Sequence, residues 1–156
     1  MGLGSNIANP SQQLAKAVEA LQSLPKTTLT AVSPVYRSSP MGPQDQPDFL
    51  NACALLQSDL QAEECLTALQ TIEQTMGRVR QRRWGERCID LDLLFFGREV
   101  RSGEFLTLPH PGLTSRDFVL APLKDLLGGD YRLTPTHTID ALLALCTTHT
   151  LDRITD

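Results

Sequence analysis

Residues 27–58, TTLTAVSPVYRSSPMGPQDQPDFLNACALLQS, contain two consecutive segments with strand character and no helix between them. The first, residues 27–37, is rich in Thr and Val and predicts a strand that bends at Pro34. The second, residues 49–58, predicts a buried strand. Residues 38–48 carry three prolines, a glycine and two aspartates, which predicts a loop. Because a doubly wound fold alternates strand and helix throughout, this stretch argues against that fold.

Amphipathic helices are predicted on both sides of this stretch. In residues 11–24, apolar side chains recur at steps of three and four, and Pro10 and Ser11 form a plausible helix start. In residues 62–76, apolar side chains form one stripe, and Gly77 provides a stop.

The order of the elements predicts an α+β protein, a ferredoxin-like βαββαβ sandwich with helices on one face of the sheet. Its first strand is a short apolar entry, residues 1–4, and its last is residues 88–96. Additional C-terminal elements are a short strand ending near Leu108 and helices at 117–127 and 139–146. No repeat or linker interrupts the 156 residues, which predicts a single domain, 1–156.

The charges are distributed unevenly along the chain. Residues 77–87 carry five of the eleven arginines against one glutamate, a local charge of +4 in a protein of net charge −4. Such a segment can be a solvated charge run. A basic patch on an acidic protein also fits a small polyanion bound at one site, and fits poorly with a broad basic surface that follows DNA or RNA.

The cysteines and the apolar segments indicate the compartment. Cys53, Cys65, Cys88 and Cys146 form no CxxC pair and lie in apolar contexts, so we expect buried free thiols. The sequence shows no signal peptide and no apolar run of 18 residues. We therefore expect a cytoplasmic protein with no membrane partner.

Asp90 and Asp92 follow the arginine segment directly, at alternate positions of an apolar run. On a strand they would point to the same face, about 6.6 Å apart at their Cα atoms, while Leu91 faces the core. Two such carboxylates can hold a pair of hard cations such as Mg²⁺. A solvated strand face is the alternative. The neighbouring arginines, whose rigid forks suit phosphate oxygens, favour a site for a nucleotide with its metal.

Other side chains could bind a flat heterocycle or a phosphate. Asn51 lies two residues after Phe49, so a ring stacked on Phe49 could receive hydrogen bonds from the Asn51 amide. Phe49 and Phe118 could equally be core residues. His110 is flanked by two prolines that would steady its imidazole, and Arg116 could join the phosphate site.

Two other ligand classes deserve comparison. Residues 2–7, GLGSNI, lack the third glycine of a dinucleotide fingerprint, so Rossmann-type binding is not expected. An RNA-binding module of ferredoxin-like fold could stack bases on Trp84. However, the sequence has no K/R-G-F/Y-G/A-F-V-x-F/Y run, and Asp90 and Asp92 would repel a phosphate backbone unless a metal intervened.

Residues 83–94, RWGERCIDLDLL, resemble the signature of the 6-hydroxymethyl-7,8-dihydropterin pyrophosphokinase family of folate biosynthesis. The signature is a basic residue, a small residue two on, an Arg, then Asp-apolar-Asp and two apolar residues. Further matches occur in the family's order over residues 2–125: GSN at 4–6, YR at 36–37, MGPQDQPDFLN at 41–51, PHP at 109–111, Arg116 and Phe118. A rival assignment is another metal-dependent nucleotidyl or phosphoryl transferase on the same fold.

The resemblance implies a ferredoxin-like enzyme that transfers pyrophosphate from ATP, its co-substrate, to the pterin hydroxymethyl group and releases AMP. The hydroxyl oxygen would attack the β-phosphorus in line. Asp90 and Asp92 would hold two Mg²⁺ ions, and Asp90 or Asp92 would also help to accept the hydroxyl proton. We expect a monomer whose partners are ATP and the pterin, with no nucleic acid.

The resemblance also implies roles for individual residues. The catalytic residues would be Arg78, Arg87, Asp90 and Asp92, with the two arginines stabilising charge on the phosphates. The pterin would lie between Phe49 and Phe118, with its edge bound by Asn51 and by the backbone near Ser38, Ser39 and Met41. The ATP site would comprise Gln70, Glu73, Arg80, Trp84, Leu93, Thr107, His110 and Arg116. Since the segment before Trp84 is about one residue shorter than in relatives, Arg82 and Arg83 are expected to be merely solvated.

Overall fold

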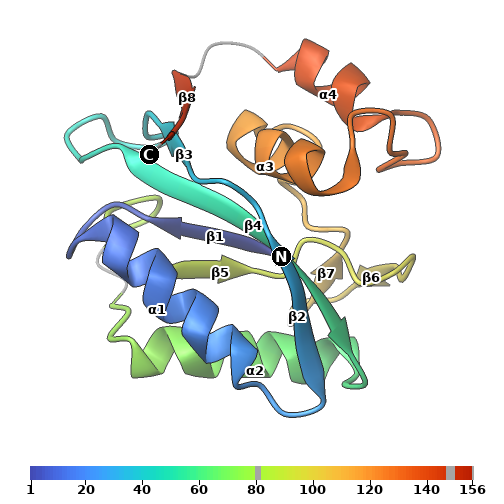
Figure 1. The fold of residues 1–156 in the computed structure, drawn as a ribbon, viewed down its shortest axis with the longest axis horizontal. Helices are drawn as coiled ribbons and strands as arrows, with labels where there is room; N and C mark the ends of the chain where they lie inside the picture. Colours follow the sequence, from blue (N-terminus) through green and yellow to red (C-terminus); the bar gives the residue numbers. More distant parts are fainter. Residues whose placement is uncertain (80–81, 147–149, 156) are drawn as a thin grey trace.

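The computed structural model describes residues 1–79, 82–146 and 150–155 (Figure 1). Within them the helices and strands follow one another in this order: β1 (Gly2–Ser5), α1 (Pro10–Gln22), β2 (Thr27–Val32), β3 (Tyr36–Ser38), β4 (Phe49–Ser58), α2 (Ala62–Thr75), β5 (Asp90–Asp92), β6 (Arg101–Ser102), β7 (Thr107–Leu108), α3 (Asp117–Leu127), α4 (Ile139–Leu145) and β8 (Leu151–Arg153). The α+β prediction is confirmed.

The main sheet has the strand order β5-β1-β4-β3-β8, and β2 also pairs with β4. Each of these pairings is antiparallel. The predicted strand 27–37 is divided into β2 and β3, which pair with different parts of β4. The division lies at Ser33, whose backbone N–H donates to Cys53 O while its Oγ accepts from Cys53 N, both at 2.9 Å. Pro34, which has no N–H to donate, follows at once.

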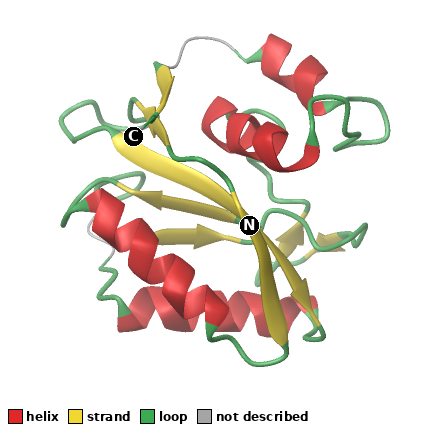
Figure 2. Cartoon of the chain, in the orientation of Figure 1, coloured by secondary structure: helices red, strands yellow, loops and turns green. Residues whose placement is uncertain are grey.

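The two faces of the sheet support different cores. Successive residues of β4 point to opposite faces, so Ala54 packs with α1 and α2 while Cys53 packs with α3 and α4. Figures 1 and 2 show α1 and α2 together below the sheet and α3 and α4 at its other side. The ferredoxin-like pattern predicted helices on one face only, and the additional C-terminal helices cover part of the second face.

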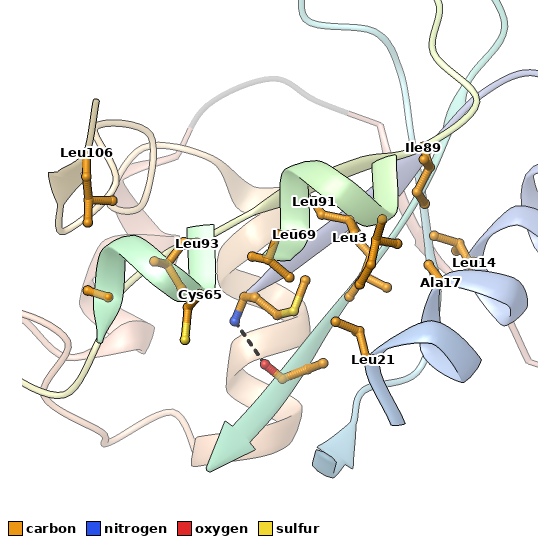
Figure 3. Close-up of a cluster of buried hydrophobic side chains, with 14 of the residues drawn as sticks. Leu3, Leu14, Ala17, Leu21, Cys65, Leu69, Ile89, Leu91, Leu93 and Leu106 are labelled. Carbon is orange, nitrogen blue, oxygen red and sulfur yellow. Dashed lines mark hydrogen bonds between the residues drawn. The ribbon is translucent and has the colours of Figure 1, made fainter. Parts of the chain in front are cut away.

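The larger core lies between the sheet and the first two helices (Figure 3). Leu3 of β1 and Leu91 of β5 point into it, where they meet Leu69 of α2 and Leu21 of α1. Leu21 is completely buried and Leu69 is 1% exposed. Burying a leucine of this kind contributes about 1.5–3 kcal/mol, so these contacts fix β1 and β5 firmly against the helices.

The other predicted helices and strands differ from those in the structure mainly in their length. Helix 117–127 has the predicted bounds, and the helices predicted at 11–24, 62–76 and 139–146 are slightly shorter or shifted. The strand predicted at 88–96 is only Asp90–Asp92, because its partner β1 offers just three paired residues. Strand β8, which pairs with β3, was not predicted. No helix in the described part of the chain is long and apolar enough to cross a membrane.

Candidate active site

An open pocket of about 770 Å³ lies on the sheet face opposite α1 and α2, beside α3 and the 38–48 loop. Strand β1 forms its floor. The two glycines of β1 lie between β4 and β5, the strand that carries the two aspartates. Gly4 pairs with Asp90 on one side and with Asn51 on the other, and Gly2 pairs with Asp92. Because Leu3 and Leu91 point into the core, the glycines and aspartates of these strands face the pocket.

The glycines keep the floor of the pocket open. A Cβ on Gly4 would touch only Asn51 Oδ1, at 3.4 Å, and would otherwise project into the pocket. A strand glycine of this kind allows a ligand to approach the backbone closely.

Two aromatic rings and an amide line the same pocket. Phe49 begins β4 and Phe118 lies in the first turn of α3. Asn51, which is 5% exposed, donates from Nδ2 to Ser38 Oγ at 2.8 Å. This bond fixes the amide and turns Oδ1 toward Gly4. The structure thus brings together in one pocket the residues expected to bind a pterin: Ser38, Ser39, Met41, Phe49, Asn51 and Phe118.

Asp90 lies between two arginines. Its Oδ1 accepts from Arg78 Nη2 at 2.8 Å and its Oδ2 accepts from Arg87 Nη1 at 2.6 Å. Each side chain is largely buried, at 20% exposure or less. The pairs are therefore screened less than surface ion pairs, and they hold both guanidiniums at the edge of the pocket.

Glu73 of α2 positions this network from below. Its Oε1 accepts the backbone N–H of Leu91 at 2.6 Å, on the edge of β5 that β1 does not cover, and its Oε2 binds Arg78 Nη1. Burial raises the pKa of Glu73, and this effect exceeds the opposing effects of the Leu91 N–H and Arg78, which lower the pKa. Sequence reasoning assigned Glu73 to the nucleotide site, but its carboxylate is engaged with the protein.

Asp92 has a different electrostatic environment. Desolvation and then the charge of Asp90 raise the pKa of Asp92 to about 7, although Arg116 opposes the shift. His110 Nε2 lies 4.0 Å from Asp92 Oδ1. The His110 Nδ1 accepts the Gly112 N–H at 2.9 Å, while burial and then Arg116 lower the pKa of the imidazole. His110 therefore presents a neutral ring with its Nε2–H toward Asp92.

The donor set fits magnesium. Asp90 and Asp92 provide carboxylate oxygens on one face of a rigid strand. Within residues 1–79, 82–146 and 150–155, no group of three or more His, Cys, Asp and Glu side chains is placed to hold a metal. Mg²⁺ is commonly held by one or two carboxylates and completes its shell with water and substrate phosphates, so two aspartates suffice.

An adjoining open pocket is lined by residues of the arginine segment: Arg78, Val79, Arg82, Arg83, Trp84, Glu86 and Arg87. The buried Nε of Arg78 has no hydrogen-bond partner among the described residues. Arg80 falls outside the described residues, and its predicted role stays a prediction.

Arg82 and Arg83 are exposed, and each also contacts other side chains; that neither takes part in phosphate binding stays a prediction. Arg82 Nη2 lies 2.9 Å from Asp45 Oδ1 and 2.9 Å from Glu86 Oε1, so it bridges the 38–48 loop and its own segment. The Arg83 guanidinium stacks over the Trp84 ring at 4.8 Å. Both arginines are engaged with the protein.

Other residues assigned to the ATP site lie apart from the main pocket. Gln70 is exposed on α2, and exposed Thr107 donates to Gly103 O at 3.2 Å. Leu93 packs in the core of α1 and α2, because it follows Asp92 and therefore faces the other side of the sheet. Arg116 and Trp84 do line the pocket. Sequence reasoning missed Asn6 and Gln46, which are 2% and 8% exposed; their residue types alone gave no signal of burial.

Comparison with known proteins agrees with this geometry. The model of the 7,8-dihydro-6-hydroxymethylpterin-pyrophosphokinase family matches residues 1–128. The chain is 45% identical over 154 residues to the 2-amino-4-hydroxy-6-hydroxymethyldihydropteridine pyrophosphokinase of Pseudomonas aeruginosa, covering 99% of this chain and 94% of that protein. It is 46% identical over 126 residues to the Haemophilus influenzae protein of the same name, covering 81% and 79%.

A third relative shows the domain within a longer protein. The chain is 41% identical over 128 residues to the folic acid synthesis protein fol1 of Pneumocystis carinii, covering 82% of this chain and 17% of that protein. The chain belongs to the 7,8-dihydro-6-hydroxymethylpterin-pyrophosphokinase family and is a pyrophosphokinase.

Proposed function

We propose that this enzyme transfers pyrophosphate from ATP to the hydroxymethyl group of 6-hydroxymethyl-7,8-dihydropterin in folate biosynthesis, releasing AMP. One observation carries the proposal. A single pocket contains an aspartate pair on one strand face, two phenyl rings and a buried amide, with a cationic pocket beside it. Family membership and the names of the relatives support the same substrates.

The acceptor would bind between Phe49 and Phe118. A flat bicyclic ring matches two aromatic faces, and each such contact adds about 0.5–1.5 kcal/mol beyond the area it buries. The Asn51 amide, fixed by Ser38, would bind the edge of the ring. This binding would direct the hydroxymethyl group toward the aspartates of β5. Holding the reacting oxygen in this orientation removes much of the entropic cost of the reaction.

In the reaction, the hydroxyl oxygen forms a bond to the β-phosphorus and the bond between that phosphorus and the α–β bridging oxygen breaks. AMP leaves with the electron pair, and the hydroxyl proton passes to an aspartate carboxylate. Arg78 and Arg87 stabilise the charge on the phosphate oxygens. Asp90 and Asp92 would hold two Mg²⁺ ions, which would supply Lewis-acid neutralisation of the phosphates. Trp84 and the arginine segment exclude water, which would compete as acceptor.

We also assign the fold to the ferredoxin-like class. The strand order β5-β1-β4-β2 with antiparallel neighbours, and the packing of α1 and α2 on one face, support this assignment. The cytoplasmic location and the monomeric state stay predictions from the sequence.

The test is incubation with ATP, Mg²⁺ and the reduced hydroxymethylpterin, followed by phosphorus NMR. AMP and a pterin diphosphate should appear in equal amounts. Formation of ADP would indicate a different phosphotransferase, and absence of turnover would refute the assignment. A filter-binding assay with single-stranded RNA addresses the non-catalytic alternative, for which tight binding would be expected.

A further inference from the structure

One hydrogen bond joins the sheet to the helix that carries Phe118. We propose that its two partners, Tyr36 and Asp125, are positioning residues that hold α3 at one place over the sheet. They thereby set the spacing of Phe49 and Phe118, the rings between which the acceptor would bind. The identity of the acceptor rests on the proposed function, whereas the connection between β3 and α3 does not.

Tyr36 lies on the pocket face of the sheet. It is the first residue of β3 and pairs directly with Asn51 of β4. The pair at the other end of β3 is Ser38 with Phe49. Directly opposed residues of an antiparallel pair point to the same face, as do residues two apart on one strand. Tyr36 therefore points to the same side as the Asn51 amide and the Phe49 ring.

Asp125 lies on the face of α3 that carries Phe118. The two residues are seven positions apart, which is nearly two helical turns and about 10.5 Å along the axis. Residues at this spacing share one face of a helix. Because Phe118 lines the pocket, the same face of α3 brings Asp125 toward β3, two turns later.

The bond between them is short and directional. The Tyr36 hydroxyl donates to Asp125 Oδ2 at 2.6 Å, a length typical of a hydrogen bond to a carboxylate. Burial and then the bond to Asp125 raise the pKa of Tyr36 to about 12, although Arg153, its neighbour on β8, opposes the shift. At neutral pH the hydroxyl therefore keeps its proton and remains a donor.

Apolar packing accounts for much of the contact between α3 and the sheet (Figure 1). Val119, Leu120 and Leu123 of α3 are buried, and they pack with Cys53 and Leu94. Apolar burial is non-directional. The hydrogen bond instead joins one atom of β3 to one atom of α3, so it selects one position of the helix among those that apolar packing permits.

The consequence concerns the affinity for the acceptor. Two residues after Tyr36, Ser38 fixes the Asn51 amide, and α3 carries Phe118, so the bond connects the two sides of the acceptor pocket. Without it, only a fraction of the molecules would hold the rings at the spacing that fits a flat ligand. The apparent affinity falls by that fraction. A bound acceptor would restore the spacing, so kcat should change little.

The test measures steady-state constants for variants of both partners. Tyr36→Phe and Asp125→Ala each remove the bond, whereas Asp125→Asn keeps an acceptor oxygen. The KM for the reduced hydroxymethylpterin should rise about fivefold in the first two, as loss of one hydrogen bond to a charged group predicts. Their kcat and KM for ATP should stay within about twofold of wild type. Asp125→Asn should recover most of the affinity, and Tyr131→Phe, at the other tyrosine of the chain, should match wild type.

The double variant Tyr36→Phe/Asp125→Ala shows whether the two residues act through one bond. Its KM for the pterin should rise no more than in the single variants. A rise of about 25-fold, the product of two independent effects, would overturn the inference. So would an unchanged KM for the pterin in both single variants, or an equal rise in the KM for ATP.

Urea unfolding of the same proteins measures the connection without substrate. Asp125 is exposed and Tyr36→Phe removes a single oxygen atom, so these variants are expected to fold. Each single variant should raise the equilibrium constant of unfolding about fivefold, and the double variant no further. Independent effects would refute the connection. If the wild-type enzyme forms no pterin diphosphate, the proposed function fails, while this comparison still decides whether Tyr36 and Asp125 hold α3.

Discussion

Replacing Asp92 by Asn should stabilise the metal-free protein above neutral pH while abolishing turnover. The Asn side chain has nearly the same shape as that of Asp92. The Asp92 carboxylate, however, carries a negative charge in an environment that disfavours it. Desolvation and the nearby Asp90 raise the pKa of Asp92 from 3.8 to about 7. Asparagine removes the charge, and it also removes a proposed metal ligand.

The sign follows from proton binding. Between pH 3.8 and about 7 the folded wild type binds a proton at Asp92 that the unfolded chain does not, so its stability falls as pH rises through this range. A difference of about three pH units corresponds to about 4 kcal/mol at most. Since the side chain is 35% exposed, solvent screening reduces this to about 1–2 kcal/mol.

Urea unfolding in the presence of EDTA would measure this effect at several pH values from 4 to 8.5. The free energy of unfolding of Asp92→Asn minus that of wild type should grow from pH 4 to 7 and then stay constant. Adding Mg²⁺ at pH 8 should stabilise the wild type more than the variant. A difference that does not change with pH would show that Asp92 is not destabilised in the fold, and the reasoning would fail.

Three further predictions test the surrounding site. In Gly42→Ala the new Cβ would lie 2.6 Å from Trp84 Cβ and should displace the arginine segment. The kcat should fall about tenfold or more, and the tryptophan emission maximum should shift. An unchanged emission maximum would contradict this contact. Arg87→Ala should lower kcat far more than Arg82→Ala, because the ion pairs of Arg82 are exposed and worth about 1 kcal/mol or less. Steady-state assays measure both values, and the reverse order would contradict this prediction. Phe49→Ala should raise the KM for the pterin about tenfold and leave that for ATP nearly unchanged, as loss of an aromatic contact predicts.

The elements predicted best are those specified by local patterns. Strand β4 has the predicted bounds, since it combines a continuous apolar run with a clear loop before it. Strand β8 is three residues long and forms because it can pair with the edge of β3. Since β3 lies about 115 positions earlier in the chain, no local pattern reveals this pairing. The strand predicted at 88–96 is shortened by its partner, because β1 can pair with only three of its residues.

The same distinction applies to the candidate site. The Asp90 and Asp92 alternation is local, and these residues do face one pocket. Arg82 pairs with Asp45, and Gln46 donates to Trp84 O, and in each case the partner is far away in the sequence. Leu93 shows the value of the local alternation, because its position next to Asp92 predicts the core location that the structure has. Its assignment to the nucleotide site stays a prediction.

The two arginines that pair with Asp90 differ in their other contacts. Each Asp90 oxygen accepts from one guanidinium, so a Mg²⁺ ion bound to Asp90 would compete with the arginines for these oxygens and repel their charges. Arg78 would still be anchored by the buried carboxylate of Glu73, which also binds the backbone of β5. The Arg87 side chain would keep only the bond from Nε to Gly85 O, at 3.3 Å, among its described contacts. If Asp90 ligates Mg²⁺, we therefore expect Arg78 to stay anchored and the Arg87 side chain to be released toward the phosphates.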